Sequence, residues 1–113
     1  MKRLFIINPQ SGVKSNDVIK EEILKTFPDA VIEFTGRAGH AKELALQNAD
    51  NFDWIIAAGG DGTANETASA LVGKKTAFGL IPCGIGNGFA REIGMPLNPL
   101  KAIRQLKKTK KVL

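Results

Sequence analysis

The sequence predicts an α/β domain, in which a parallel sheet has helices on both faces. Short apolar runs alternate along the chain with amphipathic segments of helical length, and this alternation is typical of parallel strands joined by crossover helices. A glycine-rich or small polar segment follows each apolar run, whereas a plain turn precedes each of the second, third and fourth runs. Together these features predict a Rossmann-like sheet with a ligand site along the carboxyl ends of its strands.

Four apolar runs are expected to form the strands. The first, Leu4 to Ile7, is rich in Ile and aromatic residues and is stopped by Asn-Pro, which predicts a strand buried on both faces. The other three are residues 30–35, 53–59 and 76–82. Each is followed by a segment with helical character, so all four strands are expected to be parallel.

Five helices are expected between and after these strands. Asn16 is a suitable cap for the first of them, because its short polar side chain can accept a backbone hydrogen bond. Pro99 is suited to the first position of the last helix, where no backbone donor is needed. The expected ranges are 16–27, 40–49, 63–72, 88–94 and 99–107.

The composition excludes several classes of protein. Cys83 is the only cysteine and His40 the only histidine among the 113 residues, so the chain has neither an internal disulfide nor a Cys/His metal cluster. The apolar run at the N-terminus is too short for a signal peptide or a membrane span. We therefore expect a cytoplasmic location, with peripheral association at the inner membrane face as an alternative.

The basic character of the chain belongs to its last segment. The net charge is +5, yet residues 101–113 contain six Lys and Arg and no acidic residue. No aromatic residue is interleaved with these charges, which argues against a nucleic-acid partner. A solvated helix face and a patch that faces anionic lipid or phosphate both stay open.

The glycine-rich segments indicate a phosphate ligand, because glycines at helix N-termini let backbone N–H groups approach an anion. Two standard motifs fail. Gly79 to Gly84 has the glycine spacing of a Walker A loop, but Ile85 follows where Lys is required. A dinucleotide-binding GxGxxG motif beginning at Gly84 has Phe89 at its last position. The first departure argues against a P-loop NTPase, and the second argues against a dehydrogenase.

Four segments, INPQSG, Thr35 with GHA, GGDGTANE and IPCGIGNGFAR, occur in this order along the chain. They resemble the nucleotide-binding domain of the diacylglycerol kinase and sphingosine kinase superfamily, which includes bacterial lipid kinases. The resemblance covers roughly residues 4 to 96. It implies an NAD kinase/phosphofructokinase-like fold and transfer of the γ-phosphoryl group of ATP to the hydroxyl of diacylglycerol or a related lipid.

The same resemblance implies the partners and the site. The partners are ATP as substrate, Mg²⁺ and a lipid at the membrane surface, while a homodimer is an open alternative. Asp61 is implied to hold Mg²⁺ through water, with helix capping as the alternative. Glu66 is implied to bind nucleotide, with ordering of the loop or of the helix's first turn as the alternative. The implied nucleotide-binding set is Asn8, Ser11, Gly12, Thr35, Gly59, Gly60, Asp61, Gly62, Thr63, Asn65, Glu66, Gly84, Ile85 and Asn87.

The resemblance also implies that the general base and much of the lipid pocket lie in a following all-β domain. Residues 1–110 would form the nucleotide-binding α/β domain, and residues 111–113 would begin a missing C-terminal domain. No catalytic residue is therefore expected in this chain, and the chain alone is expected to be inactive as a kinase.

Two alternative functions stay open. The first is an NAD kinase-like enzyme, although the segment from Asn8 to Gly12 argues against it. The second is a catalytically inactive nucleotide-binding regulatory module. Ile85 and Gly88 favour this second alternative, because the family usually has a hydroxyl residue and an aspartate at these two positions.

Overall fold

The computed structural model describes residues 1–9, 16–83 and 98–107. In these residues four parallel strands form one sheet with the order β2-β1-β3-β4. The strands are β1 (Arg3–Ile7), β2 (Val31–Phe34), β3 (Trp54–Gly59) and β4 (Ala77–Pro82). The predicted α/β class and all four predicted strands are confirmed.

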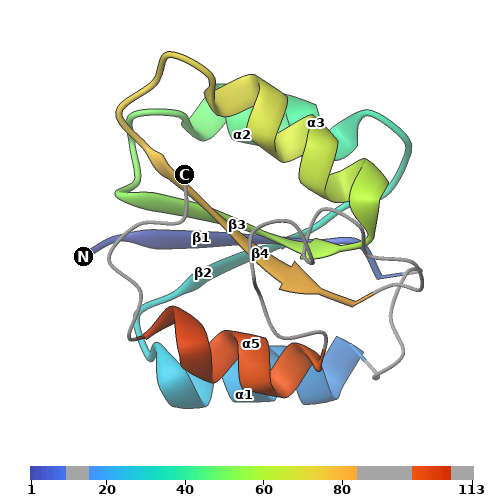
Figure 1. Ribbon diagram of the computed structural model, residues 1–113, viewed down its shortest axis with the longest axis vertical. Helices are drawn as coiled ribbons and strands as arrows, with labels where there is room; N and C mark the ends of the chain where they lie inside the picture. Colours follow the sequence, from blue (N-terminus) through green and yellow to red (C-terminus); the bar gives the residue numbers. More distant parts are fainter. Residues whose placement is uncertain (10–15, 84–97, 108–113) are drawn as a thin grey trace.

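Helices cover both faces of the sheet, as predicted (Figure 1). One layer is made by α2 (His40–Asn48) and α3 (Asp61–Leu71), and the opposite layer by α1 (Asn16–Thr26) and α5 (Pro99–Leu106). The helix expected at residues 88–94 lies outside the described residues. None of the helices in the described ranges is long and apolar enough to cross a bilayer.

The central strands form the core because helices cover them on both sides. All residues of β3 and β4 are buried, and in β1 only Arg3 is partly exposed. Ile56 pairs with Phe5 on one side and with Gly79 on the other. At the edge of the sheet, β2 leaves Val31 and Phe34 exposed. The continuous apolar runs of the other strands are thus explained by burial on both faces.

Gly79 allows α5 to lie close to β4. A Cβ atom at this position would be 2.9 Å from the Ile56 Cγ1 atom and 3.4 Å from the Leu106 Cδ2 atom. Only a residue without a side chain fits between these neighbours without displacing them.

The start of α5 matches the sequence prediction, and its exposed face is linked to α1. Pro99 is the first helical residue, and the Asn98 side chain accepts hydrogen bonds from the Leu100 and Lys101 backbone N–H groups at 3.0 and 3.3 Å.

An ion pair links α5 to α1. The Arg104 guanidinium lies 3.3 Å from the Glu22 carboxylate. This bond lowers the pKa of Glu22. Its contribution to stability is therefore present above the ordinary pKa of glutamate and is lost as the pH falls.

Candidate functional site

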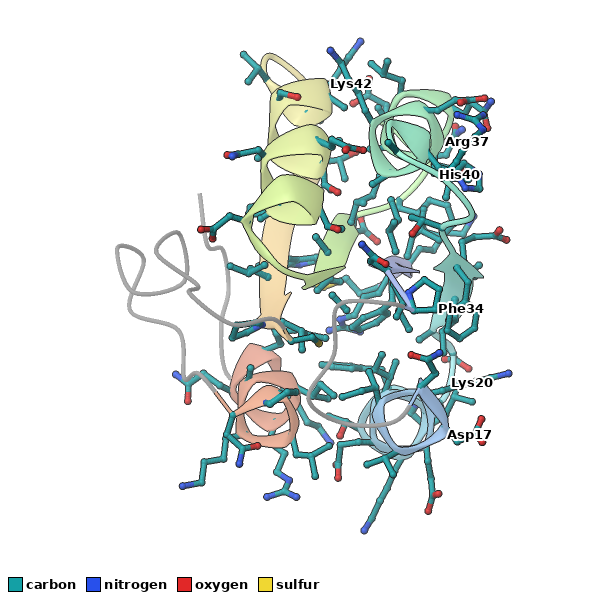
Figure 2. The ribbon with its side chains drawn as sticks, turned by 90° about the vertical axis from the view of Figure 1, so that its right-hand side faces the viewer. Asp17, Lys20, Phe34, Arg37, His40 and Lys42 are labelled. Atoms are coloured by element: carbon teal, nitrogen blue, oxygen red, sulfur yellow. The ribbon has the colours of Figure 1, made fainter. Side chains whose placement is uncertain are left out.

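The carboxyl ends of β1 and β2 border a cavity of about 520 Å³, which α2 and α3 also enclose. Parallel α/β sheets bind ligands at this edge. Figure 2 looks onto this edge and shows Phe34 at the end of β2, Arg37 in the loop before α2 and His40 at the start of α2. The described lining residues come from the end of β1, the β2–α2 loop and the first turns of the two helices: Asn8, Pro9, Thr35, Gly36, Arg37, Ala38, Ala41, Gly62, Thr63 and Glu66.

Asn8 and Thr35 are held side by side by the sheet. The Asn8 backbone N–H donates to the Ala58 carbonyl at 2.9 Å, and the Thr35 backbone N–H donates to the Ile7 carbonyl at 2.8 Å. These bonds extend the pairing of β1 beyond the strand ends. The Asn8 side-chain amide also donates to the Thr63 hydroxyl at 3.4 Å, and Thr63 is only 7% exposed. The end of β1 is thus linked to the first turn of α3.

The structure corrects the expected start of α3. The sequence predicted a loop up to Gly62 and a helix from Thr63, whereas α3 begins at Asp61 and Gly60 is its N-cap residue. The Ala64 backbone N–H closes the first turn by donating to the Gly60 carbonyl at 3.1 Å. Glycine is well tolerated at the N-cap position, because that residue has a non-helical backbone conformation. Asp61 is therefore an exposed first-turn residue and not the cap.

The predicted site residues divide into three groups. Asn8, Thr35, Gly62, Thr63 and Glu66 line the cavity together. Four others lie at the end of β3 or on the first turns of α3 but are not among the described lining residues: Gly59, Gly60, Asp61 and Asn65. The remaining five lie outside the described residues: Ser11, Gly12, Gly84, Ile85 and Asn87.

Glu66 is bonded to α2 and not to the first turn of its own helix. One carboxylate oxygen accepts the Gly39 backbone N–H and the other accepts the Lys42 backbone N–H, both at 3.4 Å. The sequence-based alternative, ordering of the glycine-rich loop or of the first turn of α3, did not include these contacts with the start of α2. Nucleotide binding by Glu66 stays a prediction.

The sequence analysis placed the segment after the second strand at the ligand edge but named only Thr35 from it as a site residue. Gly36, Arg37 and Ala38 all line the cavity. The His40 Nδ1 atom accepts the Gly36 backbone N–H at 2.8 Å, so the neutral ring carries its proton on Nε2. Arg37 forms an ion pair with Glu43 and lowers the pKa of that carboxyl. The signal available in the sequence was the position of TGRAGH directly after the second strand.

Residues 2–112 match the family model of the diacylglycerol kinase catalytic domain. The chain belongs to this family. The resemblance noted in the sequence is therefore confirmed, and the cavity lies at the edge of a diacylglycerol kinase catalytic domain.

Similar proteins support this membership. The chain is 42% identical to the diacylglycerol kinase of Bacillus subtilis (strain 168) over 107 residues, which cover 85% of this chain and 34% of that protein. It is 35% identical to a probable lipid kinase YegS-like of Klebsiella pneumoniae (strain 342), over 89% of this chain and 35% of that protein. The crystal structure of a diacylglycerol kinase from Bacillus anthracis str. Sterne superposes with a TM-score of 0.86 at 31% identity, over 95% of this chain and 42% of that one. The chain thus spans about a third of the length of these two curated relatives.

The chemistry of the family raises the question of a metal. No group of three or more His, Cys, Asp and Glu gathers in the ranges 1–9, 16–83 and 98–107. Magnesium in phosphoryl-transfer sites needs only one or two carboxylates, because phosphates and waters complete its octahedral shell. The exposed Asp61 carboxylate at the first turn of α3 fits that requirement.

Cys83, which follows β4, offers no nucleophile to this catalytic domain. It is buried, and its backbone N–H donates to the Gly59 carbonyl at 3.1 Å. Burial raises the pKa of the thiol to about 12. The thiolate that would react is therefore scarce at neutral pH.

Proposed function

We propose that this chain is the ATP-binding domain of a lipid kinase that transfers the γ-phosphoryl group of ATP to a hydroxyl of diacylglycerol or a related lipid. The observation that carries the proposal is the cavity at the carboxyl edge of the sheet, where Asn8 and Thr35 face the first turn of α3. A diacylglycerol kinase catalytic domain with polar groups and a helix N-terminus at one cavity is suited to hold a nucleotide.

In this proposal the phosphates lie at the first turn of α3. Gly60 and Gly62 present no side chain there, and the described residues leave the space next to each Cα open. Backbone N–H groups and the positive end of the helix dipole can therefore approach the phosphate oxygens. The Thr35 hydroxyl and the Asn8 side chain would contact the rest of the nucleotide. The remaining residues of the proposed nucleotide-binding set are Gly59, Thr63, Asn65, Ser11, Gly12, Gly84, Ile85 and Asn87.

Asp61 would hold Mg²⁺ through water. Bound there, the cation would neutralise phosphate charge during phosphoryl transfer. The chain's own contribution is to orient the nucleotide through the α3 backbone, so that ATP is held in one position for attack by the lipid hydroxyl.

The lipid acceptor and the general base are proposed to lie in a further domain. Residues 1–110 would supply the nucleotide half of the site, and the cleft between the two domains would receive the lipid. A lipid substrate places the enzyme at a membrane surface, so we propose a cytoplasmic protein that associates peripherally with the inner face of the membrane.

A phosphorylation assay tests this function. Labelled ATP is incubated with diacylglycerol, sphingoid bases or NAD, and the products are separated by chromatography. We expect a polypeptide with both proposed domains to label a lipid, and the 113-residue chain to bind ATP without labelling any acceptor. Labelled NAD would contradict the lipid kinase proposal. A labelled lipid with the 113-residue chain would contradict the two-domain arrangement. ATP binding by the two-domain polypeptide without labelling of any acceptor would support an inactive module.

Asp61→Asn tests the proposed metal position. We expect the dissociation constant for ATP to rise about fivefold or more when Mg²⁺ is present and to change little without it, because the neutral amide attracts the cation less and offers one acceptor fewer to its bound water. Calorimetric titration with and without Mg²⁺ measures both values. Asp29→Asn is the matched control, since Asp29 is exposed at the opposite edge of the sheet. Equal affinities of Asp61→Asn and the wild type in Mg²⁺ would show that Asp61 does not assist the metal.

A further inference from the structure

We propose that Glu66 is a positioning residue, which fixes the wall of the nucleotide cavity through the backbone of α2 and does not touch the nucleotide. Glu66 lies on α3 in the turn that follows the proposed phosphate-binding turn. Its carboxylate lies against α2, the helix packed beside it. The inference rests on the function proposed above.

The start of α2 needs an acceptor from elsewhere in the chain. Gly39 is its N-cap residue, with a φ of 81° and no side-chain capping bond. The backbone N–H groups of a first helical turn have no partner within their own helix. Glu66 supplies the missing acceptors, because its two oxygens bind the Gly39 and Lys42 N–H groups separately. A negative side chain at this helix end also interacts favourably with the helix dipole.

The same contacts fix the loop before α2. The Gly36 N–H is bonded to His40 at one end of residues 36–39, and the Gly39 N–H is bonded to Glu66 at the other. This loop supplies Gly36, Arg37 and Ala38 to the cavity lining, and the first turn of α2 supplies Ala41. The position of one wall of the cavity therefore depends on Glu66.

The charge of Glu66 argues against a direct phosphate contact. Both of its oxygens are already engaged by α2, and a carboxylate repels phosphate. By occupying the Gly39 and Lys42 N–H groups, the carboxylate also prevents these two donors from competing for the phosphates.

Glu66→Gln is the test of choice, because it keeps the shape of the side chain but replaces one acceptor oxygen with an NH₂ group. One of the two helix N–H groups then faces a donor and loses its partner. We expect amide hydrogen exchange at Gly39 or Lys42 to accelerate about tenfold, and the dissociation constant for Mg²⁺-ADP to rise about fivefold or more. Glu21→Gln is the matched control, since Glu21 is exposed on α1, on the opposite face of the sheet.

The two measurements separate the possible outcomes. Unchanged exchange at both amides would overturn the proposed contact with α2. Faster exchange with unchanged affinity, or a loss of thermal stability alone, would show that Glu66 is merely structural. Weaker binding with unchanged exchange would indicate direct contact with the nucleotide. If Glu66→Gln does not fold, Glu66→Asp replaces it, because its shorter side chain keeps the charge but cannot reach both N–H groups.

Failure of the proposed function is distinguishable from failure of this inference. If the wild-type chain binds no nucleotide, the proposed function is wrong, while amide exchange in Glu66→Gln still shows whether the carboxylate holds α2. If the wild type binds nucleotide and Glu66→Gln changes neither exchange nor affinity, the inference alone is wrong.

Discussion

Gly79→Val is expected to lower the free energy of unfolding by about 3 kcal/mol, which corresponds to a fall in melting temperature of about 10–15 °C. The added Cβ atom would lie 2.9 Å from the Ile56 Cγ1 atom, and the methyl groups would extend toward Trp54 or Leu106. The central strands are buried on both faces, so α5 or its neighbours must move away from β4. Thermal and urea denaturation, followed by circular dichroism, measure the loss.

Gly62→Ala is the control for this prediction. A Cβ atom at Gly62 meets no described neighbour within 4 Å, and alanine favours helix more than glycine by up to about 1 kcal/mol. We expect stability equal to or slightly above that of the wild type. If Gly79→Val were as stable as Gly62→Ala, the close approach of α5 to β4 would not depend on glycine.

Gly62→Leu is expected to weaken ATP binding more than tenfold while the domain stays folded. Gly62 lies in the first turn of α3 and lines the cavity. The described protein leaves space for a side chain there, and leucine is a good helix former. The added side chain would therefore occupy the volume that we assign to the phosphates. Calorimetric or NMR titration with ATP measures the affinity, and circular dichroism verifies the fold.

Ser69→Leu provides the matched control for Gly62→Leu. Ser69 is exposed on the same helix and is not among the described residues that line the cavity, so the same new side chain is placed away from the proposed phosphates. We expect its affinity for ATP to equal that of the wild type. Equal affinity of Gly62→Leu and Ser69→Leu would contradict the proposed position of the phosphates.

Much of the fold could be predicted from local sequence patterns. The run from Leu4 to Ile7 predicted a strand buried on both faces, and Leu4 to Ile7 are all buried in β1. The Asn98-Pro99 pair predicted the start of the last helix, and both residues occupy the expected positions in α5. These predictions depend on apolar periodicity and on capping, which act between neighbours in the chain.

Part of the candidate site could also be predicted. The four glycine-rich or small polar segments each follow a strand, so the parallel topology alone brings their described parts to one edge of the sheet. Asn8, Thr35 and Thr63 are accordingly found together at the cavity. The start of α3 was predicted two residues late, because the glycines were interpreted as a loop whereas Asp61 and Gly62 form the helix's first turn.

The sequence by itself determined the α/β class, the alternation of strands and helices and the edge of the sheet where the cavity lies, because these depend on residues close together in the chain. Only the tertiary structure decided that Glu66 binds the start of α2 and that Gly36, Arg37 and Ala38 are the residues of the β2–α2 loop that line the cavity with Thr35. Glu66 is 27 residues from Gly39 in the sequence. From the sequence alone, Glu66 could equally bond to the first turn of its own helix. Packing of α2 against α3 brings the carboxylate within reach of N–H groups that lack partners in their own helix, and no local pattern records that choice.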